Sequence, residues 1–427
     1  MMIAYIIAYL ASYLCARAGQ FVLSGLILIL TAIALYVSDY LKTESLINLR
    51  GLFALSFVGG EGVSCLKLSY IQTDWANETW LSFFLAFMAF YLLYEIAGRY
   101  TPKFLKNASF REIRPERFYS MILIITGVSL AAFLIEASIL GFVPLFVQNT
   151  PHAYSYFHIS GVHYFTVLCV LVPAFSVIWI LDMREKERTI TRGNRIWLIV
   201  VNVIALAIPV LCVSRFQLFS AIIMAVFAYL LKVRRLPWKW ILPLALVIAG
   251  SYLLLSAARS HGAEYLNSVF EMKINLPVDI SRIYIYIANN YDNFDCLVKQ
   301  IEGYTWGLHQ LYPVFALTGL KFVFPELTFF PFYLTKPELT TLTLIYDFYY
   351  DFGIAGVFAG TALVAALCFG TEYLVRIRKD NAAGMLYVQL ALYMLLAFFT
   401  TWFSNPTTFF YFAVTIIGYL ICTKKKE

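Results

Sequence analysis

Charged residues are scarce in this chain. Asp, Glu, Lys and Arg make up 13% of its 427 positions, about half the share found in typical soluble domains. Hydrophobic residues make up 61%, and the mean hydropathy is +0.75. This balance argues against a soluble domain and indicates a membrane protein. Charges that set membrane topology explain the net charge of +7 better than a nucleic-acid-binding surface does, so we expect no nucleic-acid partner.

Cysteine and histidine are also few, and neither forms a recognisable metal or disulfide pattern. Six of the seven cysteines fall in apolar segments, which leaves only Cys296 in a long loop. The five histidines include no i, i+4 pair and no HExxH motif, so we expect no metal and no cofactor. The segment Met1 to Leu14 is apolar from its start, which predicts a first spanning helix rather than a cleavable signal peptide.

Apolar stretches, by contrast, are abundant. A spanning helix needs roughly 20 mostly apolar residues, and the chain offers twelve candidates, of which three are short. They lie near residues 2–16, 21–38, 51–69, 79–97, 119–140, 163–182, 196–213, 217–231, 240–256, 354–375, 384–403 and 407–422. We therefore predict an all-α, polytopic membrane protein that forms a single integral membrane domain over residues 1–427.

The positive charges predict the orientation of these spans, because Lys and Arg in short loops stay on the cytoplasmic side. Twelve spans place 23 of the 32 basic residues on the face that carries both termini and 9 on the opposite face. Both termini are therefore predicted to be cytoplasmic.

One predicted external connection, residues 257–350, is far longer than most of the others. Loops of this length are usually functional, and this one contains apolar, aromatic-rich stretches. We expect short helices in the outer membrane interface, with room for one re-entrant segment, closing over a cavity. Its end, TTLTLIYDFYYDFGIAG at 340–356, places acidic and aromatic residues where the chain re-enters the membrane.

Three arginines are candidates for binding a phosphorylated ligand: Arg215 in a tight turn between two spans, Arg259 just after a span, and Arg282 in the long loop. The planar fork of an arginine binds phosphate oxygens bidentately, and three such groups could hold a pyrophosphate. The alternative is that each arginine extends to lipid headgroups.

Candidate catalytic groups are His261, Asp347 and Asp351. His261 lies between Arg259 and Glu264, and a histidine can remove a proton from a hydroxyl near neutral pH. Asp347 and Asp351 would share one face of a helix, where two carboxylates can share a proton. A surface role for His261 and a helix cap by Asp351 on the helix that follows are the alternatives.

Two further acidic residues lie inside predicted spans, where charges are costly. Glu61 sits among glycines in Gly59–Gly62, which suggests a broken or closely packed helix, and Glu136 lies near the outer end of its span. Either could pair with an external arginine, or act as a structural partner for another cation. Ten tyrosines of the long loop could stack on sugars, or form an interfacial belt.

Several segments resemble one family. Residues 283–294 (IYIYIANNYDNF) and 343–357 (TLIYDFYYDFGIAGV), together with 141–145 (GFVPL) and Ser214-Arg215, resemble the oligosaccharide repeat-unit polymerases, the Wzy-type O-antigen and capsule polymerases. The similarity in topology covers essentially the whole chain, whereas the local motifs are short.

The resemblance implies glycosyl transfer between undecaprenyl-pyrophosphate-linked oligosaccharides on the outer face of a bacterial inner membrane, without a nucleotide sugar. A chain-length regulator and a repeat-unit flippase would be further partners. Under this interpretation the three arginines bind pyrophosphate, and the candidate sugar contacts are Tyr286, Asn290 and Tyr346.

Two alternatives remain open on sequence alone. An O-antigen ligase would share the architecture and the donor but use another acceptor. A secondary transporter would also have twelve spans, although transporters built from two repeats place broken or charged helices in matching positions of both halves, and here the one long loop follows the ninth span.

Overall fold

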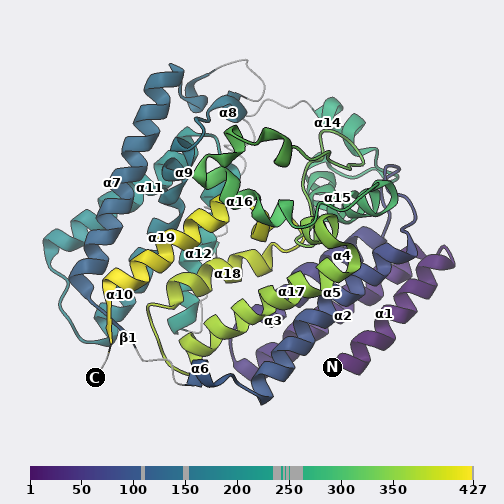
Figure 1. Ribbon diagram of the computed structural model, residues 1–427, viewed down its shortest axis with the longest axis horizontal. Helices are drawn as coiled ribbons and strands as arrows, with labels where there is room; N and C mark the ends of the chain where they lie inside the picture. The colour runs from purple at the N-terminus through teal and green to yellow at the C-terminus, as the bar shows by residue number, and fades with distance from the viewer. Residues whose placement is uncertain are drawn as a thin grey trace.

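Apolar helices make up nearly all of the computed structural model, which describes residues 1–106, 111–147, 153–233 and 263–425 together with a few isolated positions between 242 and 250. Figure 1 shows long helices running roughly side by side, with shorter helices gathered at the edge opposite the two termini. A multi-span helical membrane protein accounts for this arrangement.

Seven segments are long and apolar enough to cross a membrane by length and composition. They are α2 (Phe21–Thr43), α5 (Asn77–Arg99), α7 (Pro115–Leu140), the continuous run Val162–Glu185, α11 (Arg192–Leu211), α12 (Arg215–Val233) and α17 (Tyr346–Arg376). The run Val162–Glu185 consists of α9 (Val162–Thr166), the 3-10 turn η3 (Val167–Leu171) and α10 (Val172–Glu185).

Three shorter apolar helices are α1 (Met2–Arg17), α18 (Gly384–Leu395) and α19 (Pro406–Cys422). The predicted span 51–69 is a composite of α3 (Leu49–Phe53), the π-helical turn η1 (Ala54–Val58) and α4 (Gly59–Cys65). The predicted span 384–403 ends as a helix at Leu395, and the predicted span 240–256 lies outside the described residues. Seven long candidate spans are thus present, whereas the full set of twelve is a prediction.

The remaining elements are short or lie in the long connection. They are α6 (Lys103–Lys106), β1 (Arg111–Ile113), η2 (Pro144–Phe146), α8 (Ala153–Tyr156), α14 (Ala263–Phe270), α15 (Val278–Gln300), α16 (Leu308–Thr318), η4 (Leu320–Phe322), η5 (Pro325–Leu327), η6 (Trp402–Ser404) and β2 (Thr423–Lys425).

The two termini lie at the same edge of the molecule (Figure 1). A two-stranded antiparallel ribbon contributes to this arrangement, because β1 pairs with β2 in the register Arg111↔Lys425 and Ile113↔Thr423. The ribbon places the connection between α5 and α7 beside the C-terminal end of the chain.

The glycine-rich segment Gly59–Gly62 is closely packed. It lies within α4, directly after the π-helical turn η1, and α4 packs against α2. A Cβ atom added at Gly62 would lie 2.8 Å from the Gly25 carbonyl oxygen, and one added at Gly25 would lie 2.6 Å from the Gly62 carbonyl oxygen. Side chains at either position would force the two helices apart.

The long connection differs from the expected set of short interfacial helices. Although α14 and α16 are short, α15 has 23 residues and buries twelve of them, including two aspartates and three asparagines. It does not qualify as a membrane span. Apart from the Ser281 hydroxyl, its buried polar side chains are hydrogen-bonded within the protein. Helix α15 therefore forms an internal support for the long connection rather than a surface helix.

Candidate functional site

His309 of α16 contacts Asp347 of α17. The His309 Nδ1 atom is 3.3 Å from Asp347 Oδ1, and both side chains are about one-tenth exposed. The hydroxyl of Ser404, in η6, donates a hydrogen bond to the other carboxylate oxygen of Asp347. Asp347 therefore holds the imidazole ring in a fixed orientation.

The imidazole of His309 is enclosed by aromatic rings. Its centroid lies 4.0 Å from that of Phe330 and 4.4 Å from that of Tyr350. Its second nitrogen, Nε2, is buried and has no hydrogen-bond partner among the described residues. A carboxylate on Nδ1 favours the tautomer in which Nε2 is a proton acceptor, so this ring is prepared to take a proton from a bound hydroxyl.

Asp351 fixes the start of α16. Its carboxylate accepts hydrogen bonds from the backbone nitrogens of His309 at 3.1 Å and Gln310 at 3.0 Å, and from the Thr305 hydroxyl at 2.5 Å. These bonds satisfy amide groups that a helix N-terminus leaves open. The sequence alternative was that Asp351 caps the helix that follows it in the chain. Asp351 does cap a helix N-terminus, but that helix is α16, which precedes Asp351 in the chain.

The break after Asp351 explains how one helix can hold both carboxylates against α16. Phe352 and Gly353 have non-helical backbone angles inside α17, and Gly353 has φ +59° and ψ −146°. An added Cβ at Gly353 would lie 2.6 Å from the Tyr304 hydroxyl oxygen. Only glycine fits this turn without strain. Residues 346–351 thus form a short helical piece that carries Asp347 and Asp351 to different atoms of His309.

The segment between α18 and α19, residues 396–405, connects the other candidate residues to the His309–Asp347 contact. Ser404 bonds Asp347, and the carbonyl oxygen of Phe398 accepts a hydrogen bond from Asn290 Nδ2 at 2.7 Å. Phe399 lies edge-on to Tyr286, with ring centroids 6.4 Å apart. Phe216, the residue after Arg215, stacks on both Phe399 and Trp402 at 5.6 and 5.8 Å. Helices α12, α15 and α17 therefore meet at one segment.

The candidate sugar contacts differ in exposure. Tyr286 is 36% exposed, whereas Asn290 and Tyr346 are almost fully buried. Besides its bond to Phe398, Asn290 accepts a hydrogen bond of 2.5 Å from Thr341, and the Tyr346 hydroxyl bonds the backbone of Tyr333. Tyr286 is therefore the candidate best placed to meet a ligand, and the buried pair orders the chain around it.

Arg282, Tyr286 and Asn290 follow one another at intervals of four residues, which places them on the same face of α15. Arg282 pairs with Asp279 at 3.2 Å, and its side chain is 12% exposed. Arg215 begins α12 and is half-buried. Arg259 and His261 lie outside the described residues.

The two buried glutamates bond groups other than arginine in the described part of the chain. Glu61 accepts a hydrogen bond of 2.7 Å from the Tyr9 hydroxyl. Glu136 contacts His163 Nδ1 at 3.1 Å and accepts hydrogen bonds from the Ile159 amide and the Thr166 hydroxyl. Glu136 thus fixes the connection after α7. No group of three or more His, Cys, Asp or Glu residues suited to a metal occurs within the described ranges.

A second buried ionic cluster lies where α15 meets the end of α4. Asp292 accepts hydrogen bonds from Lys67 at 2.6 Å, Gln72 at 2.7 Å, Trp75 at 2.8 Å and Ser64 at 3.1 Å. Four donors occupy its two oxygens, so the cluster is complete without a ligand. The Tyr284 hydroxyl bonds Gln72, and burial raises the pKa of this tyrosine above its usual range.

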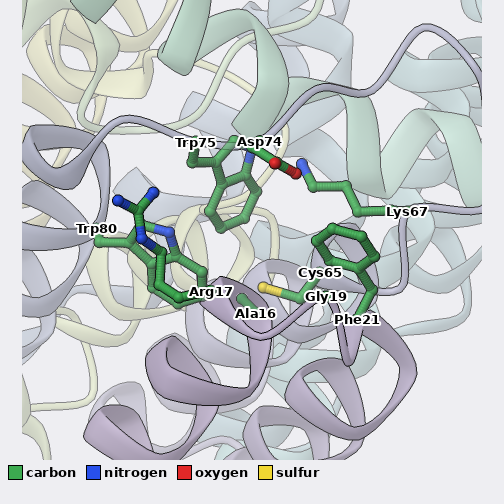
Figure 2. A pocket seen from close by; sticks show the side chains of 9 residues that line it. All are labelled: Ala16, Arg17, Gly19, Phe21, Cys65, Lys67, Asp74, Trp75 and Trp80. Atoms are coloured by element: carbon green, nitrogen blue, oxygen red, sulfur yellow. The ribbon is translucent and has the colours of Figure 1, made fainter.

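A cavity of about 180 Å³ lies beside this cluster. Figure 2 shows Lys67 and Arg17 on opposite sides of it, with Trp75 and Trp80 in its wall. Because the Lys67 charge is already paired with Asp292, the cavity offers only one uncompensated cation, and Asp74 also lines it. It is a weaker candidate for an anionic ligand than the region around His309.

Sequence reasoning missed His309 and Ser404. His309 was one of five histidines on the predicted external side, but no spacing connects it with Asp347 or Ser404. Only the tertiary structure brings these residues together. The chain has no match among the family models, the curated proteins or the solved structures with which it was compared.

Proposed function

We infer that this protein is a polysaccharide polymerase that joins undecaprenyl-pyrophosphate-linked oligosaccharide repeat units. It would act on the outer face of a bacterial cytoplasmic membrane, with about twelve spans and both termini in the cytoplasm. The resemblance of residues 283–294 and 343–357 to repeat-unit polymerases supports this function. The observation that carries it is the buried, unpartnered Nε2 atom of His309, whose ring Asp347 orients from the other side.

His309 serves as the general base in this proposal. Its Nε2 atom takes the proton from a hydroxyl of the incoming lipid-linked unit, and Asp347 stabilises the imidazolium that forms. The hydroxyl oxygen forms a bond to the anomeric carbon of the growing glycan. The bond between that carbon and the pyrophosphate oxygen breaks, and its electron pair leaves with undecaprenyl pyrophosphate. Asp351 holds the start of α16 and so positions His309.

The departing pyrophosphate gains negative charge, which hydrogen-bond donors and positive charges would stabilise. Arg282 lies on the α15 face that carries Tyr286 and Asn290, and this face reaches residues 396–405. Arg215 reaches the same segment through its neighbour Phe216. These arginines, together with Arg259, would stabilise the leaving group, while Tyr286 would stack on a sugar ring.

The test uses purified protein in liposomes and the lipid-linked repeat unit that accumulates when the encoding gene is deleted. Wild-type protein should produce a ladder of longer glycans without ATP, nucleotide sugar or an ion gradient. His309→Gln keeps a polar side chain beside Asp347 but cannot act as a base, so its initial rate should fall by about 10²- to 10⁴-fold. His158→Gln, which changes an exposed histidine, should retain the wild-type rate.

Other results would point elsewhere. A near-normal rate for His309→Gln would remove the proposed base. Transfer of a single glycan to a different acceptor, without elongation, would indicate a ligase. Movement of the lipid-linked substrate across the membrane with unchanged glycan length would indicate a transporter.

A further inference from the structure

A cavity of about 770 Å³ opens between α10 and α11, at the ends that lie nearest the C-terminal ribbon. Lys186, next to this opening, pairs with Glu112 of β1 at 3.1 Å, which places the cavity mouth on the side of the molecule that carries the termini. This cavity belongs to the opposite side of the protein from the His309 region and plays no part in the proposed reaction.

The mouth of the cavity is strongly basic. Arg184, Arg188 and Arg195 line it, and no carboxylate does. All three arginines are exposed and have no ion pair among the described residues. Two nearby acidic side chains are already engaged, because Glu185 pairs with Lys232 at 2.6 Å and Asp182 pairs with Lys186 at 3.0 Å. Glu187 lines the neighbouring groove and not this cavity.

Below the mouth the cavity is apolar. Leu198, Ile199, Val203 and Leu206 of α11 continue its wall, and Asn202 is the only other polar residue in the lining. Ile199 is 60% exposed and Val203 is 62% exposed. At 1.5 Å per residue, the wall from Arg195 to Leu206 extends roughly 16 Å along the helix. This length is close to half of a hydrocarbon core that is about 30 Å thick.

We propose that this cavity is a binding site for an anionic phospholipid of the membrane leaflet on the terminal side. The phosphate would lie among the three guanidinium groups, which bind phosphate oxygens bidentately, and one acyl chain would lie along the wall of α11. A neighbouring groove of about 1000 Å³ shares Arg188 but is also lined by Glu116 and Glu187. Those carboxylates make it a poorer match for an anion.

Basic residues that only set topology would attract anionic lipid to the same extent whether or not they line the cavity. Arg192 provides the matched comparison, because it is an exposed arginine of the same helix end but does not line the cavity. Three basic residues near an anionic lipid contribute roughly 100-fold in affinity, and the arginines of the cavity should account for this difference while Arg192 should not.

The experiment is native mass spectrometry of the purified full-length protein titrated with phosphatidylglycerol or with phosphatidylcholine of the same acyl chains. Wild-type protein should retain phosphatidylglycerol preferentially, and the triple variant Arg184→Gln/Arg188→Gln/Arg195→Gln should lose roughly 100-fold of that affinity. Arg192→Gln should bind like wild type. Val203→Trp, which fills the apolar part and leaves the arginines intact, should also weaken binding.

Three results would overturn the proposal: equal retention of both lipids, unchanged binding in the triple variant, or a loss in Arg192→Gln as large as in the triple variant. Displacement of the lipid by millimolar inorganic phosphate, with no effect of Val203→Trp, would assign the arginines to a free anion and would also overturn it. If the triple variant does not fold, Arg188→Gln and Val203→Trp test the headgroup and the acyl-chain contacts separately.

Discussion

Two buried aspartates, Asp292 of α15 and Asp347 of α17, have opposite surroundings. Asp292 receives four hydrogen bonds, one of them from the buried ammonium of Lys67, and every donor belongs to the segment 64–75. Asp347 has only a serine hydroxyl and an imidazole, and that imidazole presents a buried nitrogen without a partner. In the first cluster every polar atom of Asp292 has a hydrogen-bond partner, and we call it the closed cluster. In the second, which we call the open cluster, the His309 Nε2 atom has no partner among the described residues.

This difference separates a structural role from a chemical one. A buried ionic group is tolerated when every lone pair and proton is matched, as around Asp292, and the result is a rigid connection between α15 and the segment that follows α4. A buried nitrogen without a partner costs free energy unless a ligand completes it. Burial alone would rank the two aspartates equally, but the count of unmatched atoms favours the His309 cluster as the reactive one.

The largest effect on stability should come from removing the Asp292 carboxylate from the closed cluster. Asp292→Ala leaves the Lys67 ammonium buried, with a side chain only 6% exposed, and removes the acceptor for three other donors. Breaking one partner of a buried ion pair costs about 3–5 kcal/mol. Thermal unfolding followed by size-exclusion chromatography in detergent should show a strongly destabilised or aggregated variant.

Asp347→Asn is the matched comparison, because it keeps the side-chain volume in the open cluster. Its unfolding temperature should stay close to that of the wild type, while glycan elongation slows. If both variants unfold alike, the distinction between a closed structural cluster and an open reactive one is wrong.

A smaller but specific effect is expected at the arginines. If Arg215, Arg259 and Arg282 bind the pyrophosphate as it departs, removing one should slow elongation on the order of 100-fold, as the loss of one preorganised donor does. Lysine should substitute poorly, because a point charge lacks the bidentate fork. The measurement is the rate of glycan elongation for the Arg→Ala and Arg→Lys variants at each site, at matched expression levels.

Arginines that merely extend to lipid headgroups would give the reverse pattern, since lysine reaches the interface equally well. Near-normal activity in all three lysine variants would refute the bidentate contacts. Near-normal activity in an alanine variant would remove that arginine from the site.

The sequence predicted the apolar framework better than the polar connections within it. Helices α2, α5 and α7 could be predicted from composition alone, because a run of about 20 mostly apolar residues is typical of a membrane-spanning helix. The same rule does not predict α15 as a buried helix, because α15 contains too many aspartates and asparagines. They are buried because partners far away in the chain satisfy them. Trp75 is 217 residues from Asp292, and Thr341 is 51 residues from Asn290.

The candidate site shows the same limit. Asp347 and Asp351 were found because they stand close together in an unusual motif at a membrane boundary. His309 could not be linked to them, since Ser404 lies 57 residues beyond Asp347 and Phe330 covers the ring from a third segment. Local patterns identify acids and arginines, but which of them lacks a partner depends on contacts between distant segments.

The last prediction concerns Cys296, which reports on the packing around Asp292 and leaves glycan elongation unchanged. This thiol lies on α15 one residue after Asp295, and burial together with the charges of Asp295 and Asp292 raises its pKa to about 11. The thiolate is the reactive form, so little of it exists near neutral pH. A membrane-impermeant maleimide should label Cys296 slowly at pH 7.5, and the rate should rise about tenfold for each pH unit up to pH 9.5.

A cysteine at Glu302 in a Cys296→Ser background provides the comparison. Glu302 is exposed just beyond the end of α15, and an ordinary thiol pKa of about 8.5 should make its labelling at pH 7.5 roughly 10²- to 10³-fold faster. Both sites should react only from the outside of intact cells, whereas a cysteine at Arg192 should react only after permeabilisation. Equal rates at Cys296 and at the introduced cysteine would show that α15 is not packed around Asp292, and labelling of Glu302→Cys only after permeabilisation would reverse the predicted orientation.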